Sequence, residues 1–329
     1  LTISRISYRN CVRRKTKKKL DMAAHPADDR WMALALGLGR RGMGRTWPNP
    51  AVGCVIVKDG VVLGRGWTQP GGRPHAETMA LAQAGAASRG ATAYVTLEPC
   101  AHHGKTPPCA AALRDAGISR VVSALQDPDP RVAGKGHAML ADAGVQLTIG
   151  PGAREAAEDH AGFLLTRREH RPLVTLKLAA SFDGRIATAT GESQWITGPE
   201  ARRHVHALRA RHDAVMVGAG TARADDPALT VRGFGDIVHP LRIVTDSRLS
   251  TDPKGQLGRT AAEVPVWLCH GDQAPDERRR AWQATGAELV ACAVDPASGR
   301  LDINHLLRAL ADKGLTRIFC EGGGQLAAS

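Results

Sequence analysis

The sequence of 329 residues predicts an α/β protein built from two domains. Short apolar runs typical of buried strands alternate with Ala- and Leu-rich stretches typical of helices, first over residues 25–150 and again from residue 173. A charged segment, residues 163–172, separates the two alternations and is predicted as a connector. The length agrees with this division, because domains commonly have about 100–200 residues.

The first alternation predicts its elements in a definite order. A helix-like stretch over 28–36 is followed by the turn signal Asn49-Pro50 and by a strand over 52–57. Lys58-Asp59-Gly60 is typical of a hairpin turn, which leads into a strand over 61–63. The remaining elements are a helix over 75–87, a strand over 93–97, a helix over 109–116 and a strand over 121–125.

The second alternation begins at Leu173. Its predicted strands cover 173–178, 214–218, 241–246, 264–269 and 316–321, and its helices lie near 200–211 and 302–313. Gly218-Ala219-Gly220 is followed by Arg223 where a Rossmann fingerprint needs its last glycine, so that fingerprint is absent. The glycine turn 322–324 either presents free backbone N–H groups to a phosphate or is a flexible loop.

The net charge of +12 first suggests a nucleic-acid partner, but the charge is concentrated at one end. Residues 1–19 contain eight Lys and Arg residues and no acidic residue, so the other 310 residues carry only +4. Base-stacking surfaces also need aromatic side chains, and the chain has only 12. Residues 1–24 are therefore predicted as a basic, disordered extension, with the functional protein starting near Met22. A targeting peptide is the alternative interpretation.

The seven cysteines do not suggest a disulfide framework, because their number is odd and they are scattered along a long chain. The basic start leads into no continuous apolar segment of the kind found in secretory signals. No apolar run approaches the roughly 18 residues that a membrane span needs. We therefore expect a reducing, cytoplasmic compartment and no membrane partner.

Residues 75–109 contain side chains that together suit a catalytic zinc site. His75-Ala76-Glu77 opens a helix, Pro99-Cys100 follows a strand, and Cys109 lies nine residues later. One imidazole and two thiolates can hold zinc and leave the fourth position to a water of lowered pKa. Glu77 suits a proton shuttle from that water to a leaving amine. This is the pattern of zinc nucleobase deaminases, with the gap between the cysteines widened.

Two other interpretations of these residues stay open. A structural zinc site would need a fourth protein ligand, which His102 or His103 is near enough to supply. The three residues could also be unrelated members of the core.

The segment 99–109, PCAHHGKTPPC, resembles the bifunctional deaminase/reductase family of riboflavin biosynthesis, in which the cysteine gap has this widened form. Pro48-Asn49-Pro50 upstream and the QDPDP segment 126–130 downstream carry the same resemblance. It covers about 30–329 and continues through KLAASFDG at 177–184, GESQWIT at 191–197, ADDPALT at 224–230 and EGG at 321–323.

The resemblance implies a cytidine-deaminase-like zinc domain over 25–168. It implies the zinc ligands His75, Cys100 and Cys109, with Glu77 as the proton donor. The residues that it places against the substrate pyrimidine or its ribose phosphate are Asn49, His102 and Lys105. An ammonium group beside a phosphate is chemically suitable, although Lys105 could also be a solvated loop residue.

The resemblance also implies a dihydrofolate-reductase-like domain over 169–329 that uses NADPH. The implied NADP contacts are Ala179, Trp195, Thr221, Asp225, Ser247 and the turn from Gly323. The implied substrate contacts are Ser193, Arg209, Leu229, Arg232 and Glu321. Guanidinium groups suit the substrate's phosphate, although any one of these residues could be surface decoration.

The implied reactions start from a diaminopyrimidinone that carries a phosphoribosylamino group. Zinc-bound hydroxide deaminates it, and NADPH then reduces its ribosyl chain to ribityl. One Zn²⁺ per chain, NADPH and a homo-oligomeric assembly are expected, without nucleic acid. The alternatives are a nucleic-acid-editing zinc deaminase that uses the basic arm, and a zinc-stabilised scaffold without activity.

Members of this family continue beyond the point that corresponds to residue 329. We therefore expect an incomplete, unstable and poorly active reductase domain, with an uncovered strand 316–321. The two activities are expected to separate at the connector, so that residues 22–168 alone release ammonia.

Overall fold

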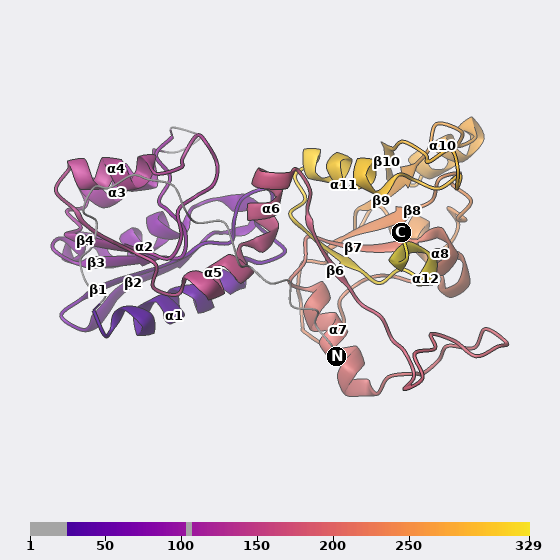
Figure 1. Ribbon diagram of the computed structural model, residues 1–329, viewed down its shortest axis with the longest axis horizontal. Coiled ribbons are helices and arrows are strands. Elements are labelled where there is room, and N and C mark those ends of the chain that lie inside the picture. The colour runs from indigo at the N-terminus through magenta and orange to yellow at the C-terminus, as the bar shows by residue number, and fades with distance from the viewer. Residues whose placement is uncertain (1–24, 103–106) are drawn as a thin grey trace.

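The computed structural model describes residues 25–102 and 107–329, and it consists of two α/β lobes that lie side by side (Figure 1). In the first lobe the five-stranded sheet has the order β2-β1-β3-β4-β5. The strand β1 pairs antiparallel with β2 and β3, whereas β3, β4 and β5 run parallel. The strands are β1 (Gly53–Lys58), β2 (Val61–Trp67), β3 (Thr92–Val95), β4 (Arg120–Ser123) and β5 (Gln146–Ile149).

Helices cover both faces of this first sheet. The helices α1 (Asp28–Gly39) and α5 (Ala153–Asp159) lie on one face, and α2 (Ala76–Ala84), α3 (Cys109–Asp115) and α4 (Lys135–Asp142) on the other (Figure 1). Alternate residues of β1 divide between the two cores: Val55 packs with α1, while Ile56 packs with α2 and α3. Short 3₁₀ turns occupy Arg40–Gly42, Pro70–Gly72 and Gly85–Ser88.

The prediction that residues 163–172 form a connector is wrong, because most of this segment belongs to the helix α6 (Ala161–Glu169). Phe163 and Leu164 at its start are buried in the core of the first lobe. Its charged residues, Arg167 and Arg168, lie in the last turn of the helix. The prediction considered only the charged composition of this segment and therefore missed the apolar face of a helix. Only three residues link α6 to the next strand.

The second sheet is parallel throughout and has the order β10-β9-β8-β7-β11-β6. Its strands are β6 (Leu173–Leu176), β7 (Ala214–Gly218), β8 (Leu241–Thr245), β9 (Val266–His270), β10 (Glu288–Ala291) and β11 (Arg317–Cys320). Its helices are α7 (Pro199–Arg209), α8 (Ala219–Asp225), α9 (Gln256–Arg259), α10 (Asp276–Gln283), α11 (Ile303–Asp312) and α12 (Gly324–Ala327). The predicted strands and helices all occur, with shifted ends, whereas β10, α8, α9 and α10 were not predicted.

The expectation of an uncovered strand at 316–321 is wrong. The strand β11 lies inside the sheet and pairs with β7 on one side and with β6 on the other. The sequence could not show this, because strand order depends on which crossovers pack, and not on the position of a strand in the chain.

The two lobes contact each other through the loop that precedes β1 and through the end of α5. Trp47 packs with the core of the second lobe, and its ring meets that of Trp267 edge to face, with centroids 6.4 Å apart. Arg317 of β11 donates hydrogen bonds of 2.7 and 2.8 Å to the backbone oxygens of Glu158 and Asp159. Each lobe therefore supplies part of the environment of the other.

Among the described residues, no helix is both long enough and apolar enough to span a membrane.

A buried histidine makes the stability of the first lobe sensitive to acid. Burial lowers the pKa of His160 to about 4, and its Nε2 lies 3.1 Å from Thr96 Oγ1. The folded state keeps this imidazole neutral. Its contribution to the free energy of unfolding is therefore complete above the ordinary pKa of about 6.5 and declines as the pH falls towards 4. Between pH 7 and pH 5 this amounts to about 2 kcal/mol.

We therefore expect His160→Gln to flatten the pH dependence of the stability of metal-free protein. The glutamine can still meet Thr96 but does not titrate. Urea unfolding at pH 7 and pH 5 measures the difference, and His170→Gln, at a largely exposed histidine, is the matched control. An identical loss of stability in the parent and in His160→Gln would contradict this account.

Candidate active sites

The residues that sequence spacing singled out as metal ligands come together at the end of β3. His75 directly precedes α2, Cys100 follows β3, and Cys109 is the first residue of α3. Their ligand atoms all lie within 4.8 Å of one another. His75 Nδ1 is 3.3 Å from Cys109 Sγ and 3.8 Å from Cys100 Sγ, so three elements distant in sequence form one cluster.

The thiols of this cluster influence each other strongly. The hydrogen bond from Cys109 lowers the pKa of the Cys100 thiol to about 4, and the same bond together with burial raises the pKa of Cys109. The hydrogen bond with Cys100 raises the pKa of His75. A thiolate is thus stabilised at Cys100, and the thiolate is the form of cysteine that binds metals.

Glu77 lies in the first turn of α2 and is only 3% exposed. Burial, with the negative charge of Cys100 adding to it, raises the pKa of Glu77 to about 7. A carboxyl group with a pKa near neutrality can both accept and donate a proton at physiological pH, which is what a general acid–base catalyst needs.

The donor set of the cluster fits a zinc ion with an open coordination position. One imidazole and two sulfur atoms are the ligands of catalytic zinc sites that bind water in the fourth position. Within the described part of the chain, the cluster does not include His102, whose Nδ1 is buried without a hydrogen-bond partner. His103 and Lys105 lie outside the described residues.

Asn49, the other predicted substrate contact in this lobe, lies against the turn that leads to His75. A Cβ atom at Gly72 would lie 1.8 Å from Asn49 Nδ2, and Gly72 has a φ of +83°. Only glycine combines that backbone conformation with room for the amide.

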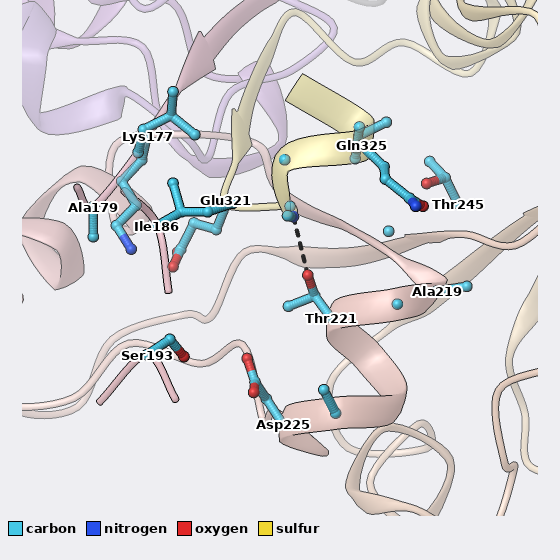
Figure 2. A pocket seen from close by; sticks show the side chains of 18 of the residues that line it. Lys177, Ala179, Ile186, Ser193, Ala219, Thr221, Asp225, Thr245, Glu321 and Gln325 are labelled. Atoms are coloured by element: carbon cyan, nitrogen blue, oxygen red, sulfur yellow. Dashed lines mark hydrogen bonds between the residues drawn. The ribbon is translucent and has the colours of Figure 1, made fainter. Parts of the chain in front are cut away.

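The second lobe contains a cavity of about 1060 Å³ at the carboxyl ends of its strands. This edge of a parallel sheet is where α/β proteins bind ligands. Ten of the eleven residues predicted for the second lobe line it, as Figure 2 shows in part. They are Ala179, Ser193, Trp195, Arg209, Thr221, Asp225, Arg232, Ser247, Glu321 and Gly323.

The glycine turn that follows β11 is fixed to the start of α8. The backbone N–H of Gly323 donates a hydrogen bond of 3.0 Å to Thr221 Oγ1, drawn dashed in Figure 2. This turn brings Glu321 and the glycines 322–324 into the cavity wall, as the sequence suggested. Trp195, which also lines the cavity, is exposed, and the guanidinium of Arg202 lies 4.5 Å from the centre of its ring.

Arg209 is paired with another predicted substrate contact. Its Nε and Nη2 donate to the two carboxylate oxygens of Glu321 at 2.5 and 3.0 Å, and its Nη1 donates to the backbone oxygen of Thr230. This forked face of the guanidinium could bind a phosphate only if the ion pair opened. Arg232 is exposed and keeps its guanidinium available.

The second site differs from the prediction at two residues. Leu229 does not line the cavity, because its side chain is 3% exposed and packs in the core. Lys177 was not singled out by sequence, although it lines the cavity (Figure 2). Its position directly after a parallel strand was the available signal.

The fold and the two sites define a zinc-type deaminase domain joined to a parallel α/β domain with a ligand cavity. Comparisons with known proteins agree with this class. Residues 26–125 match the cytidine and deoxycytidylate deaminase zinc-binding region, and residues 172–329 match the RibD C-terminal domain. The chain belongs to the RibD family of riboflavin biosynthesis proteins, which are bifunctional deaminases and reductases.

Individual relatives support this assignment over most of the chain. The riboflavin biosynthesis protein RibD of Escherichia coli is 44% identical over an alignment 312 residues long, which covers 91% of this chain and 83% of that protein. The structure of Acinetobacter baumannii RibD matches with a TM-score of 0.80 at 40% identity, covering 91% of this chain and 82% of that one. The Thermotoga maritima deaminase/reductase matches with a TM-score of 0.79 at 33% identity and the same coverages.

Proposed function

We propose that this chain carries out two consecutive steps on one phosphorylated pyrimidine. The first lobe deaminates a diaminopyrimidinone that carries a phosphoribosylamino group, and the second reduces the ribosyl chain of the product to ribityl with NADPH. The observation that carries the proposal is the cluster of His75, Cys100 and Cys109 beside the buried Glu77, in a chain whose other half is a RibD reductase domain.

In the deaminase site, His75, Cys100 and Cys109 would hold zinc. When bound, zinc supplies an activated water as the nucleophile. Glu77 accepts a proton from the nucleophile and delivers it to the departing amine, so that one water is consumed and one ammonia is released. Asn49, His102 and Lys105 hold the pyrimidine and its phosphate.

In the reductase site, the nicotinamide cofactor supplies a hydride. We assign the cofactor to Ala179, Trp195, Thr221, Asp225, Ser247 and the turn at Gly323. The remaining cavity residues, Ser193, Arg209, Arg232 and Glu321, are assigned to the substrate, with Leu229 contributing at most its backbone. The ion pair between Arg209 and Glu321 supports a shared role, since it fixes both side chains on one wall.

The wider context follows the same proposal. The domains are assigned to 25–168 and 169–329, and the protein acts in the cytoplasm as a homo-oligomer on a small molecule. The six described cysteines are all free, which supports a reducing compartment. No observation on the described residues favours a nucleic-acid substrate.

Incubation with the diaminopyrimidinone substrate, with and without NADPH, tests the proposal directly. Ammonia should appear in both samples, and NADPH should be oxidised only when the deaminated product has formed. Ammonia release from cytidine in RNA but not from the phosphorylated pyrimidine would overturn it.

Glu77→Gln should retain zinc and lose turnover by about 10²–10⁴-fold, because the amide cannot carry the proton while the three ligands are untouched. Zinc content and ammonia release from the same preparation measure the two effects. Cys100→Ser is the matched comparison and should lose both. If Glu77→Gln deaminates at the parent rate, another group moves the proton.

The contact between Trp47 and Trp267 should affect the deaminase site, because Trp47 lies two residues before Asn49. Removing this aromatic pair with Trp267→Ala should raise KM for the pyrimidine about two- to tenfold, corresponding to the 0.5–1.5 kcal/mol of such pairs. Zinc content should not change, since no ligand lies in the second lobe.

Trp282→Phe, in the core of the second lobe, is the control and should leave this KM unchanged. Residues 22–168 expressed alone are still predicted to deaminate, but with the same rise in KM. A fragment with the KM of the full chain would show that the loop holds its position without the second lobe.

A further inference from the structure

A buried carboxylate outside the ligand cluster connects the segment that carries Cys100 to the loop after β4 and to α4. Glu98 lies between β3 and Cys100, and its side chain is fully buried. Its Oε1 accepts hydrogen bonds from the backbone N–H groups of Gly136 and His137, at 2.9 and 3.2 Å. Its Oε2 accepts from those of Asp127 and Gly134, at 3.1 and 3.0 Å.

This arrangement is more specific than a buried ion pair. Four backbone N–H groups, from the loop after β4 and from the first turn of α4, converge on one carboxylate. Only an anion with two acceptor oxygens satisfies all four, because an amide would turn a donor towards two of them. A donor left unsatisfied in a buried site destabilises the arrangement that holds it.

Close packing against α4 also fixes Pro99, the residue that follows Glu98. A Cβ atom at Gly136 would lie 1.9 Å from the backbone oxygen of Pro99, so α4 can approach this closely only with glycine at its second residue. Pro99 is thereby pressed against α4, while Cys100 extends from it towards His75 and Cys109. The sulfur of Cys100 accepts a hydrogen bond of 3.3 Å from the backbone N–H of Cys109.

We propose that Glu98 is a positioning residue of the deaminase, which fixes the Pro99–Cys100 segment on α4 and so sets the position of Cys100 Sγ relative to the other two ligands. The residue does not touch the ligands and takes no part in proton transfer. The inference rests on the ligand set proposed above, and it predicts that metal geometry depends on four hydrogen bonds to a group outside that set.

The test uses the full chain loaded with Co²⁺ in place of zinc, because thiolate-to-cobalt absorption reports the geometry at the cysteines independently of turnover. In Glu98→Gln, the absorption should shift or weaken, and zinc affinity, measured by competition with a chelator, should fall about 10–100-fold. Losses of this size are typical when partners outside the ligand set are removed. kcat should fall with KM little changed, since no substrate contact is altered.

Asp28→Asn is the matched control. Asp28 is also a fully buried carboxylate of the first lobe, bonded to both terminal nitrogens of Arg120 and to Tyr94. Its substitution should lower the melting temperature while leaving the cobalt spectrum and the zinc affinity at parent values. If Glu98→Gln shows the parent spectrum and affinity, or if Asp28→Asn disturbs both equally, Glu98 has only a structural role and the proposal is overturned.

If Glu98→Gln does not fold, Gly136→Ala decides, because its Cβ would lie 1.9 Å from the backbone oxygen of Pro99 and 3.2 Å from Glu98 Oε1 and so displaces the segment that Glu98 holds. It should reproduce the altered spectrum, and a parent spectrum in folded Gly136→Ala would overturn the proposal. Failure of the ligand set itself is distinguishable, because zinc would then stay bound in Cys100→Ser.

Discussion

The deaminase site depends on how closely two helices approach the hairpin of β1 and β2. A Cβ atom at Gly64 or Gly66 would lie 2.1 Å from the backbone oxygens of Ala80 and Ala76 in α2, and one at Gly53 would lie 1.8 Å from Ala35 in α1. Glycine in these strands therefore has a steric purpose, because it lets helix backbone rest directly on strand backbone. The depth to which α2 sinks into the hairpin sets where its first turn begins. That turn presents the imidazole and the carboxyl group to the two thiols.

The two sites use different physical means to hold their ligands. The deaminase cluster is small and desolvated, so that each charge changes the protonation of the next and one carboxyl group is held near neutrality. The reductase cavity is large, lies at the edge of the sheet, and offers a long wall of backbone and hydroxyl groups. The first arrangement suits chemistry on a single ring atom, and the second suits an extended dinucleotide. The absence of a Rossmann fingerprint agrees with the second, since the glycine turn there follows β11, the sixth strand of this sheet in chain order, and not the first.

Much of this could be predicted from the sequence, for identifiable reasons. The ligand set was accessible because catalytic zinc restricts residue types and spacing, and the strands because buried parallel strands are continuous apolar runs. The helical state of 161–169 was missed because its charges outnumber the apolar residues that it buries. The Arg209–Glu321 pair joins residues 112 apart, and the four donors to Glu98 are backbone groups, which no side-chain pattern encodes. Strand order within the second sheet was inaccessible for the same reason, since it is decided by packing between distant segments.

The contacts between the lobes show that the boundary in sequence is not a boundary in packing. Trp47, which precedes the first strand of the deaminase lobe, packs with the core of the reductase lobe. Arg317 of the reductase sheet donates hydrogen bonds to backbone oxygens at the end of α5. Trp47 is partly buried by this contact, so separating the lobes exposes apolar surface of Trp47 and of Trp267. The loop that carries Asn49 is therefore held from both sides, by Gly72 of its own lobe and by the indole of Trp267 in the other. A chain with a deaminase and a reductase domain is therefore packed through residues of both lobes, and the loop that carries Asn49 takes part of its support from the reductase lobe.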